Sequence, residues 1–203
     1  MQRFARPNGE QTMKAIYTAS AHVTGGRLDG RGRTGDGQVD IPLRMPAELG
    51  GLGDGANPEQ LLAIGWAACF EATLATAAHR DKMSMKSVED AEIDARVMLM
   101  VPAPEVGEFE LGVEFDVTLP SITDQELANR LVRITHELCP YSKATRGNVD
   151  VRLTVNGIPV GWDPAPQSRR RCWPPARETP GASGGSACRG RPQTPRPDDR
   201  RTE

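Results

Sequence analysis

The sequence predicts an α+β domain in which antiparallel sheets pack around two central helices. Several short stretches alternate apolar and polar residues, which is typical of strands with one buried face. Two longer stretches carry apolar residues at helical spacing. The predicted elements come in clusters, in the order strand, strand, helix, strand, strand, helix, strand, and such clustering favours an α+β architecture over a parallel α/β sheet.

Residues 14–162 are expected to form this domain. Residues 1–13 are expected to be a flexible leader, within which Met13 is an alternative start. Residues 163–203 hold eight of the 17 prolines and nine arginines, but no Val, Ile, Leu, Met or Phe. Such a segment buries too little apolar surface to offset its ordering entropy, so we expect a disordered tail. Its charge of +4 opposes a charge of −6 in residues 1–162, and its run of three arginines is interpreted as a solvated extension.

The composition argues against two classes of partner. A net charge of −2 and an aromatic content of 4% do not suit a nucleic-acid-binding surface. No stretch reaches the roughly 18 consecutive apolar residues of a membrane span, and residues 1–13 lack the apolar core of a signal peptide. We therefore expect a soluble, cytoplasmic protein.

The first predicted elements are a hairpin and a long helix. Residues 15–23 and 39–43 partly alternate on either side of a glycine turn, which indicates an opening antiparallel hairpin. Asn57 can cap a helix, Pro58 suits its first turn, and Glu59 suits its positive end. The helix should run for about 20 residues, to about residue 80, and be apolar on most sides and largely buried.

The second half repeats this pattern. Residues 91–100 and 110–119 alternate and predict two strands, the second burying Leu111, Val113, Phe115, Val117 and Leu119. Residues 123–126 read as a capping box, and helical spacing follows until Pro140. Residues 149–155 alternate again after a Gly-Asn turn, predicting a last strand that ends near Trp162.

The cysteines are the candidate reactive groups. Cys69 falls inside the first predicted helix and Cys139 at the end of the second, whereas Cys172 and Cys188 lie in the tail without an assigned role. A zinc site needs closely spaced ligands, and the pairing of His136 with Cys139 supplies two at most, so no metal is expected. A structural disulfide is disfavoured in the cytoplasm. Residue types alone therefore leave two plain buried thiols as the simplest interpretation.

Four sequence motifs lie at the glycine turn, at the start of the first predicted helix and at the two cysteines. They are Thr24-Gly25-Gly26-Arg27, Asn57-Pro58-Glu59-Gln60, Ala68-Cys69-Phe70, and Cys139-Pro140-Tyr141-Ser142 leading to Arg146-Gly147-Asn148. In these motifs, and over residues 14–156, the sequence resembles the organic hydroperoxide resistance proteins of the OsmC-like superfamily. The resemblance implies an OsmC-like fold in an intertwined homodimer. It also implies a thiol peroxidase that reduces organic hydroperoxides, including those of fatty acids, to alcohols. The resemblance implies no bound cofactor, and an external dithiol of lipoyl type, such as a lipoylated protein, as reductant.

Roles carry over at the matching positions. The resemblance makes Cys69 the peroxidatic cysteine, Cys139 the resolving cysteine, Arg27 the group that stabilises thiolate and peroxide, and Glu59 the carboxylate that orients Arg27. An apolar slot beside Cys69 would be lined by Trp66, Phe70 and Thr73, with ordinary core packing as the alternative.

Two departures stand out. Trp66 replaces a more common Tyr, and Glu71 puts a charge where an apolar residue is usual. Glu71 would raise the pKa of Cys69 if it faced the pocket; its place about 200° around the helix favours solvent.

The chemistry explains why an arginine is needed. A thiolate is the reactive form, and Cys69 lies about 12 residues into its helix, too far for the helix dipole to stabilise it. Arg27, always charged, is the expected cation. Glu59 lies ten residues before Cys69, about 15 Å along the axis, so one Arg27 side chain cannot easily contact both within one chain. We therefore expect a dimer with antiparallel first helices. The alternative function is a non-catalytic protein of the same fold that binds a lipid-like ligand.

Overall fold

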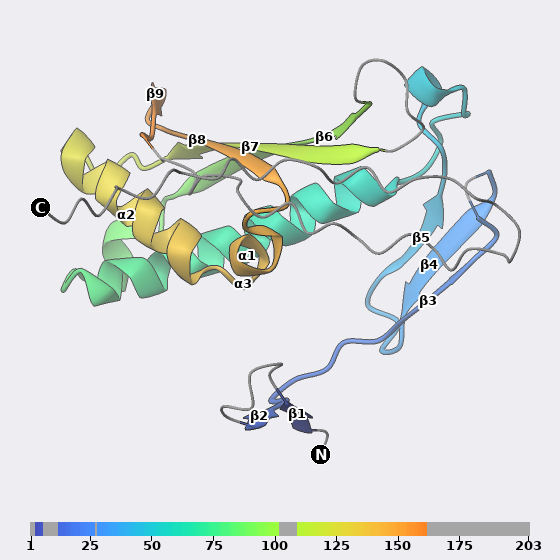
Figure 1. Ribbon diagram of the computed structural model, residues 1–203, viewed down its shortest axis with the longest axis horizontal. Coiled ribbons are helices and arrows are strands. Elements are labelled where there is room, and N and C mark those ends of the chain that lie inside the picture. The colour runs from blue at the N-terminus through green and yellow to red at the C-terminus, as the bar shows by residue number, and fades with distance from the viewer. Residues whose placement is uncertain (1–2, 6–11, 27, 102–108, 162–203) are drawn as a thin grey trace, which may run out of the picture. The chain divides into compact units, whose positions relative to one another are not determined.

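The computed structural model describes residues 3–5, 12–26, 28–101 and 109–161. The predicted tail, Trp162 and Arg27 lie outside the described residues. The α+β class is confirmed (Figure 1). The helices are α1 (Pro58–Arg80), α2 (Gln125–Leu138) and α3 (Pro140–Thr145), with short 3₁₀ turns η1 (Ala47–Leu49) and η2 (Met85–Val88). The strands are β1 (Arg3–Ala5), β2 (Thr12–Lys14), β3 (Ala21–Thr24), β4 (Gly30–Thr34), β5 (Asp40–Leu43), β6 (Glu92–Met100), β7 (Glu110–Thr118), β8 (Asp150–Val155) and β9 (Ile158–Pro159).

The N-terminal region forms three antiparallel strands where the sequence analysis expected two. β4 lies between β3 and β5, and it was missed because Gly-Arg-Gly-Arg-Thr has no apolar alternation. Its Gly32 suits the position, since an added Cβ would lie 3.3 Å from the Leu43 side chain. Arg31 pairs with Asp40 across the sheet at 2.7 Å. Within the expected leader, β1 and β2 pair as a further antiparallel ladder.

Helix α1 begins and ends as predicted. Asn57 accepts a hydrogen bond from the Gln60 backbone N–H at 2.9 Å, and the Gln60 side chain accepts one from the Asn57 backbone N–H at 3.0 Å, which forms a capping box. The expectation that α1 is largely buried is wrong for the single chain: Ile64 is 68% exposed and Leu61 39%. Among the described helices, α1 alone has the length and apolar composition of a membrane span, and here it packs against β6 and α2.

A second sheet has the order β6, β7, β8, β9. The β6–β7 pair is antiparallel, as predicted. β8 runs parallel to β7 because α2 and α3 form the crossover between them, so this sheet is mixed. β8 stops at Val155, earlier than expected, because Asn156 and Gly157 adopt positive φ angles of 50° and 78° and turn the chain into β9.

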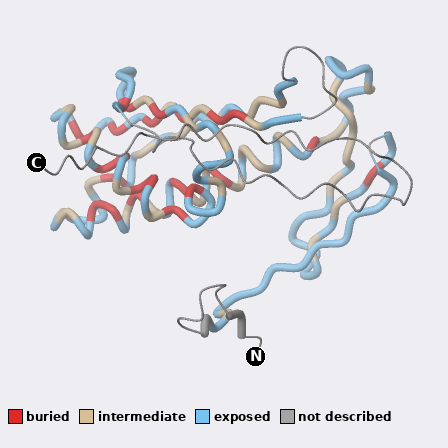
Figure 2. The backbone as a smooth tube through the Cα atoms, viewed as in Figure 1, coloured by how far each residue is buried: buried red, intermediate tan, exposed pale blue. Residues whose placement is uncertain are grey.

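The core lies between the four-stranded sheet and the helices. Buried residues gather in α1, α2 and β7, whereas the residues of the β3–β5 sheet are mostly exposed or half-buried (Figure 2). Phe115 of β7 stacks on Phe70, with ring centroids 5.1 Å apart, and meets Trp66 edge-on at 5.6 Å. Of the residues predicted to share the buried face of β7, Leu111 is half-buried and the other four are at most 1% exposed.

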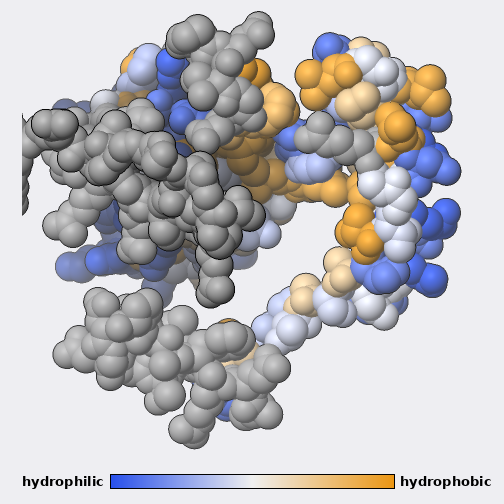
Figure 3. Space-filling view, turned by 45° about the vertical axis from the view of Figure 1, so that its right-hand side comes forward, coloured by the Kyte–Doolittle hydropathy of each residue, from blue (hydrophilic) through white to orange (hydrophobic). Residues whose placement is uncertain are grey.

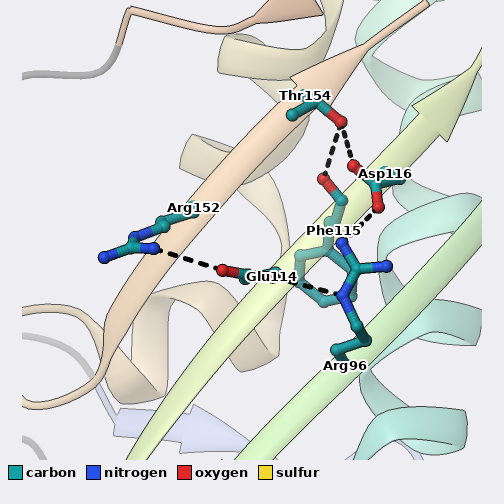
Figure 4. Close-up of polar contacts among 6 residues, drawn as sticks. All are labelled: Arg96, Glu114, Phe115, Asp116, Arg152 and Thr154. Atoms are coloured by element: carbon teal, nitrogen blue, oxygen red, sulfur yellow. Dashed lines mark hydrogen bonds and ion pairs between the residues drawn. The ribbon is translucent and has the colours of Figure 1, made fainter. Parts of the chain in front are cut away.

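The opposite face of this sheet is charged (Figure 4). Arg96 of β6 pairs with Glu114 at 3.1 Å and with Asp116, while Arg152 of β8 contacts Glu114 at 3.3 Å. The hydroxyl of Thr154 donates to Asp116, and this bond, together with Arg96, lowers the pKa of the Asp116 carboxyl. One face of the sheet is therefore polar, and the core forms only on the helix side.

The crossover contains two helices in place of the predicted one. The side chain of Asp124 caps α2 by accepting from the backbone N–H groups of Glu126 and Leu127, so the cap lies one residue later than the predicted capping box. The first helix of the crossover, α2, ends just before Pro140, as predicted. Pro140 also begins α3, because proline fits the first turn of a helix.

His136 of α2 generates a prediction about stability. Burial, helped by the charge of Arg146, lowers the pKa of His136 to about 4, below the value of about 6.5 expected in an unfolded chain. Between these two values the unfolded chain binds a proton that the folded chain does not, so stability falls as pH decreases through this range. We expect His136→Gln to lose less unfolding free energy than the wild type between pH 7 and 4.5 in urea titrations. His79→Gln, at an exposed site on α1, should follow the wild type; parallel curves for all three proteins would contradict the assignment.

Candidate functional site

The fold brings together two cysteines that are 70 residues apart. Cys69 lies in the middle of α1 and Cys139 at the joint between α2 and α3. The Cys139 thiol donates to the Cys69 sulfur at 3.6 Å. A disulfide needs about 2.05 Å between the sulfurs, so both thiols are reduced and within about 1.5 Å of bonding distance.

Hydrogen bonds fix the main chain around each cysteine. Thr73, one turn further along α1, donates its hydroxyl to the Cys69 carbonyl at 2.7 Å. Cys139 has an extended backbone (φ −54°, ψ 125°), while its N–H donates to the Thr135 carbonyl and its carbonyl accepts from the Lys143 N–H. Cys69 is half-buried and Cys139 fully buried, so a small molecule can approach Cys69 first.

The electrostatics of the described residues do not activate Cys69. Burial raises the pKa of the Cys69 thiol, and the adjacent Cys139 raises it further, while the backbone N–H of Tyr141 acts in the opposite direction. No basic side chain in the described part of the chain is among the groups that lower this pKa. A reactive thiolate therefore needs a cation from elsewhere.

A buried hydrogen bond joins α1 to α3 beside the thiols. The indole N–H of Trp66 donates to the Ser142 hydroxyl at 3.2 Å, and both residues are fully buried. Nearby, the Tyr141 ring lies over Gly65, where an added Cβ would meet the ring at 3.4 Å. Neither residue of this pair was predicted from the sequence to take part in such a contact. The available signal was the spacing, since Trp66 lies three residues before Cys69 and Ser142 three residues after Cys139.

The predicted slot residues lie mainly in the core. Trp66 and Phe70 have no exposed surface and pack on Phe115. Thr73 is half-buried and bonds to the backbone of Cys69. The packing alternative thus accounts for Trp66 and Phe70 in this structure, and contact with substrate stays a prediction for all three.

Glu59 lies away from the thiols. It lines a groove of about 510 Å³ between η1, the first turn of α1 and β6, and it forms no ion pair with any residue that the structure describes. Glu59 and Cys69 are ten residues apart on one continuous helix, about 15 Å along the axis. The described residues therefore do not bring the predicted carboxylate to the thiol.

Two other expectations concern the surroundings of the site. Glu71 is exposed on α1, in agreement with its predicted direction. Within the described ranges, no group of three or more His, Cys, Asp or Glu side chains is arranged to hold a metal ion.

Comparison with known proteins places this site in a family. The family model for OsmC-like proteins matches residues 51–154. The organic hydroperoxide resistance protein of Xanthomonas axonopodis pv. citri is 44% identical over 144 residues, which cover 70% of this chain and 96% of that protein. OhrB of Bacillus subtilis is 42% identical over 141 residues, covering 70% and 98% of the two chains.

Solved structures agree. The crystal structure of an organic hydroperoxide resistance protein from Legionella pneumophila, 44% identical, matches with a TM-score of 0.63 over 70% of this chain and 98% of that one. The structure of Bacillus subtilis OhrB matches with a TM-score of 0.61 over 70% and 99% of the two chains. Sequence and fold agree, and the chain belongs to the OsmC-like family, in its organic hydroperoxide resistance group.

Proposed function

We propose that the protein is a thiol-dependent peroxidase that reduces organic hydroperoxides to alcohols and so protects the cell from oxidative stress. The observation that carries this proposal is the 3.6 Å approach of the Cys69 and Cys139 sulfurs. Two reduced thiols at this distance, one half-buried and one fully buried, suit a peroxidatic and a resolving cysteine. The names of the relatives support organic hydroperoxides as the substrates, and the half-buried setting of Cys69 suits alkyl hydroperoxides, including those of fatty acids.

The reaction proceeds in three steps. The Cys69 thiolate attacks the distal peroxide oxygen, so an S–O bond forms, the O–O bond breaks and the alkoxide takes up a proton to leave as alcohol. Cys139 then attacks the sulfur of the Cys69 sulfenic acid, so an S–S bond forms and the hydroxyl leaves as water with the proton of the Cys139 thiol. An external dithiol, for which a lipoyl group of a lipoylated protein is our candidate, reduces the disulfide by exchange and is itself oxidised to a disulfide.

Arg27 supplies the charge that the described residues lack. Its guanidinium would lower the pKa of Cys69 and stabilise the departing alkoxide, and Glu59 would hold that guanidinium in place. The raised pKa of Cys69 in the described surroundings supports this need. A cytoplasmic location fits the cycle, because a reducing compartment keeps both thiols available between turnovers.

A homodimer would cover apolar surface that is exposed in the single chain. On α1, Leu61, Ile64 and Ala68 are exposed beside the thiol site, and other apolar side chains lie open elsewhere on the chain (Figure 3). Exposed apolar residues at helical spacing are typical of an interface. A second copy with its α1 antiparallel to the first would cover this stripe and bring one subunit's Glu59 towards the other's thiols, so that one Arg27 can serve both.

The first prediction tests the thiol chemistry. In a background with Cys172 and Cys188 changed to Ser, one equivalent of cumene hydroperoxide should remove both remaining thiols quickly, whereas hydrogen peroxide should act slowly. Cys69→Ser should keep its one thiol, because Cys139 is fully buried. Cys139→Ser should lose its single thiol to a sulfenic acid. Free thiols are counted over time with a chromogenic disulfide.

The same assay separates the two candidate functions. A non-catalytic protein that binds a lipid-like ligand would retain both thiols in the presence of hydroperoxide. That result would refute the peroxidase proposal and direct attention to bound ligands.

The second prediction concerns Arg27. We expect Arg27→Gln to slow Cys69 oxidation about 100-fold at pH 7 and to move the midpoint of its pH–rate profile to higher pH, because the thiolate loses its stabilising charge. The oxidation rate and midpoint of Arg27→Lys should lie between those of Arg27→Gln and the wild type, since lysine keeps the charge but not the planar guanidinium. Arg33→Gln, on the exposed side of β4, should behave as the wild type. An unchanged midpoint in Arg27→Gln would remove Arg27 from the mechanism.

The third prediction concerns assembly. Ile64→Glu should give a folded monomer in sedimentation and lose peroxidase turnover, because it places a charge in the proposed interface. Met85→Glu is the matched control: this residue is also an exposed large hydrophobic, at 57%, but it lies in η2 outside the stripe. A wild type that is monomeric and fully active would exclude the dimer.

A further inference from the structure

We infer that the hydrogen bond from Trp66 to Ser142 is a positioning contact that sets the rate at which Cys139 resolves oxidised Cys69. The inference rests on the proposed peroxidase function and deepens it by assigning residues to the second chemical step. Neither residue is given this role by the resemblance to relatives. Trp66 was expected to line the substrate slot, yet its one polar group is directed to α3.

The contact runs beside the thiol pair. Trp66 lies one turn before Cys69 on α1, and Ser142 lies one turn after Cys139 on α3. The two helices are therefore joined twice within one helical turn, once by the thiols at 3.6 Å and once by the indole and hydroxyl at 3.2 Å. Oxidation of Cys69 changes the chemistry of the thiol pair, whereas the indole and the hydroxyl keep their donor and acceptor groups.

The contact is also rigid on its α1 side. The Trp66 ring is fully buried and meets Phe115 of β7 edge-on at 5.6 Å, so the indole N–H has a fixed direction. Ser142 is fully buried as well, and water cannot replace a lost partner at low cost. Trp66 therefore links α3 to β7, and so fixes the position of α3 relative to the four-stranded sheet.

The resolving step is the one that needs α3 to be placed accurately. Attack on peroxide takes place at Cys69, whose main-chain position is set by α1, although the Tyr141 backbone N–H of α3 also bonds to its thiol. Disulfide formation instead requires the sulfurs to close from 3.6 Å to about 2.05 Å, with S–S formation and loss of water from the sulfenic acid. Cys139 lies at an extended joint between two helices, so its approach depends on how α3 is held.

The experiment measures the two steps separately in the chain that retains only Cys69 and Cys139. Sulfenic acid formation is followed by trapping with dimedone after one equivalent of cumene hydroperoxide, and disulfide formation by mass. We expect Ser142→Ala to leave the first rate within about twofold and to slow disulfide formation about tenfold, with more over-oxidised Cys69 at excess peroxide. Ser142→Thr, which retains the hydroxyl, should restore the disulfide rate.

Two controls exclude a general loss of packing. Val117→Ala removes fully buried side-chain volume from β7, a strand that holds neither thiol, and should not change the ratio of the two rates. In the Trp66→Phe background, Ser142→Ala should have little additional effect on disulfide formation, because the donor is already gone. If Ser142→Ala does not fold, the Trp66→Phe variant tests the inference by itself. It must then form the Cys69–Cys139 disulfide more slowly than the wild type.

The outcomes are distinct. A wild type that consumes no thiol refutes the peroxidase function and the inference with it. A wild type that forms the disulfide, together with a folded Ser142→Ala that resolves at the wild-type rate or slows in both steps equally, refutes the inference alone.

Discussion

The close packing of α1 against α2 and α3 is the constraint on which the rest of this structure depends. Together with the packing of α1 on the four-stranded sheet, it buries the aromatic contact of Trp66 and Phe70 with Phe115 of β7, and it sets the distance between Cys69 and Cys139. The same packing therefore provides both the core and the reactive pair. Because protein interiors tolerate little change in volume, a substitution in this interface is expected to alter stability and thiol geometry together. This coupling explains why slot residues and core residues are hard to distinguish at Trp66 and Phe70.

The same packing makes Cys69 a poor thiolate within the described surroundings. Burial and the adjacent thiol raise its pKa, and one backbone N–H acts against them. A site of this kind is inactive until a charge is added from another element. In the proposed mechanism Arg27 supplies that charge, so the thiol would be nucleophilic only with the arginine in place and would be protected from unselective oxidation before then. The exposed stripe on α1 and the exposed β3–β5 sheet are the surfaces from which such completion can come.

Much of this arrangement could be predicted from local sequence. The Asn57 cap, the extent of α1, the β6–β7 pair and the buried face of β7 follow from capping chemistry and from alternation, which are encoded in neighbouring residues. β4 could not be predicted in this way because its pairing, and not its own residues, makes it a strand. The parallel pairing of β8 and the Trp66–Ser142 bond join residues far apart in sequence, so capping and alternation do not specify them, and the spacing of Trp66 and Ser142 from the two cysteines was the one hint at the bond. The open face of α1 was missed for a related reason, since an apolar helix has the same pattern whether its partner is its own chain or another.

The parallel β7–β8 pairing has a consequence for biosynthesis. Cys139 lies in the crossover between these strands, so its position is fixed only when β8 has docked beside β7. During translation, Cys69 therefore emerges about 70 residues before its partner and has no intramolecular thiol to rescue it. In the proposed mechanism, a Cys69 sulfenic acid that formed at this stage would have no Cys139 to resolve it. Reduction of such a sulfenic acid would then depend on thiols in solution until the crossover that carries Cys139 is in place.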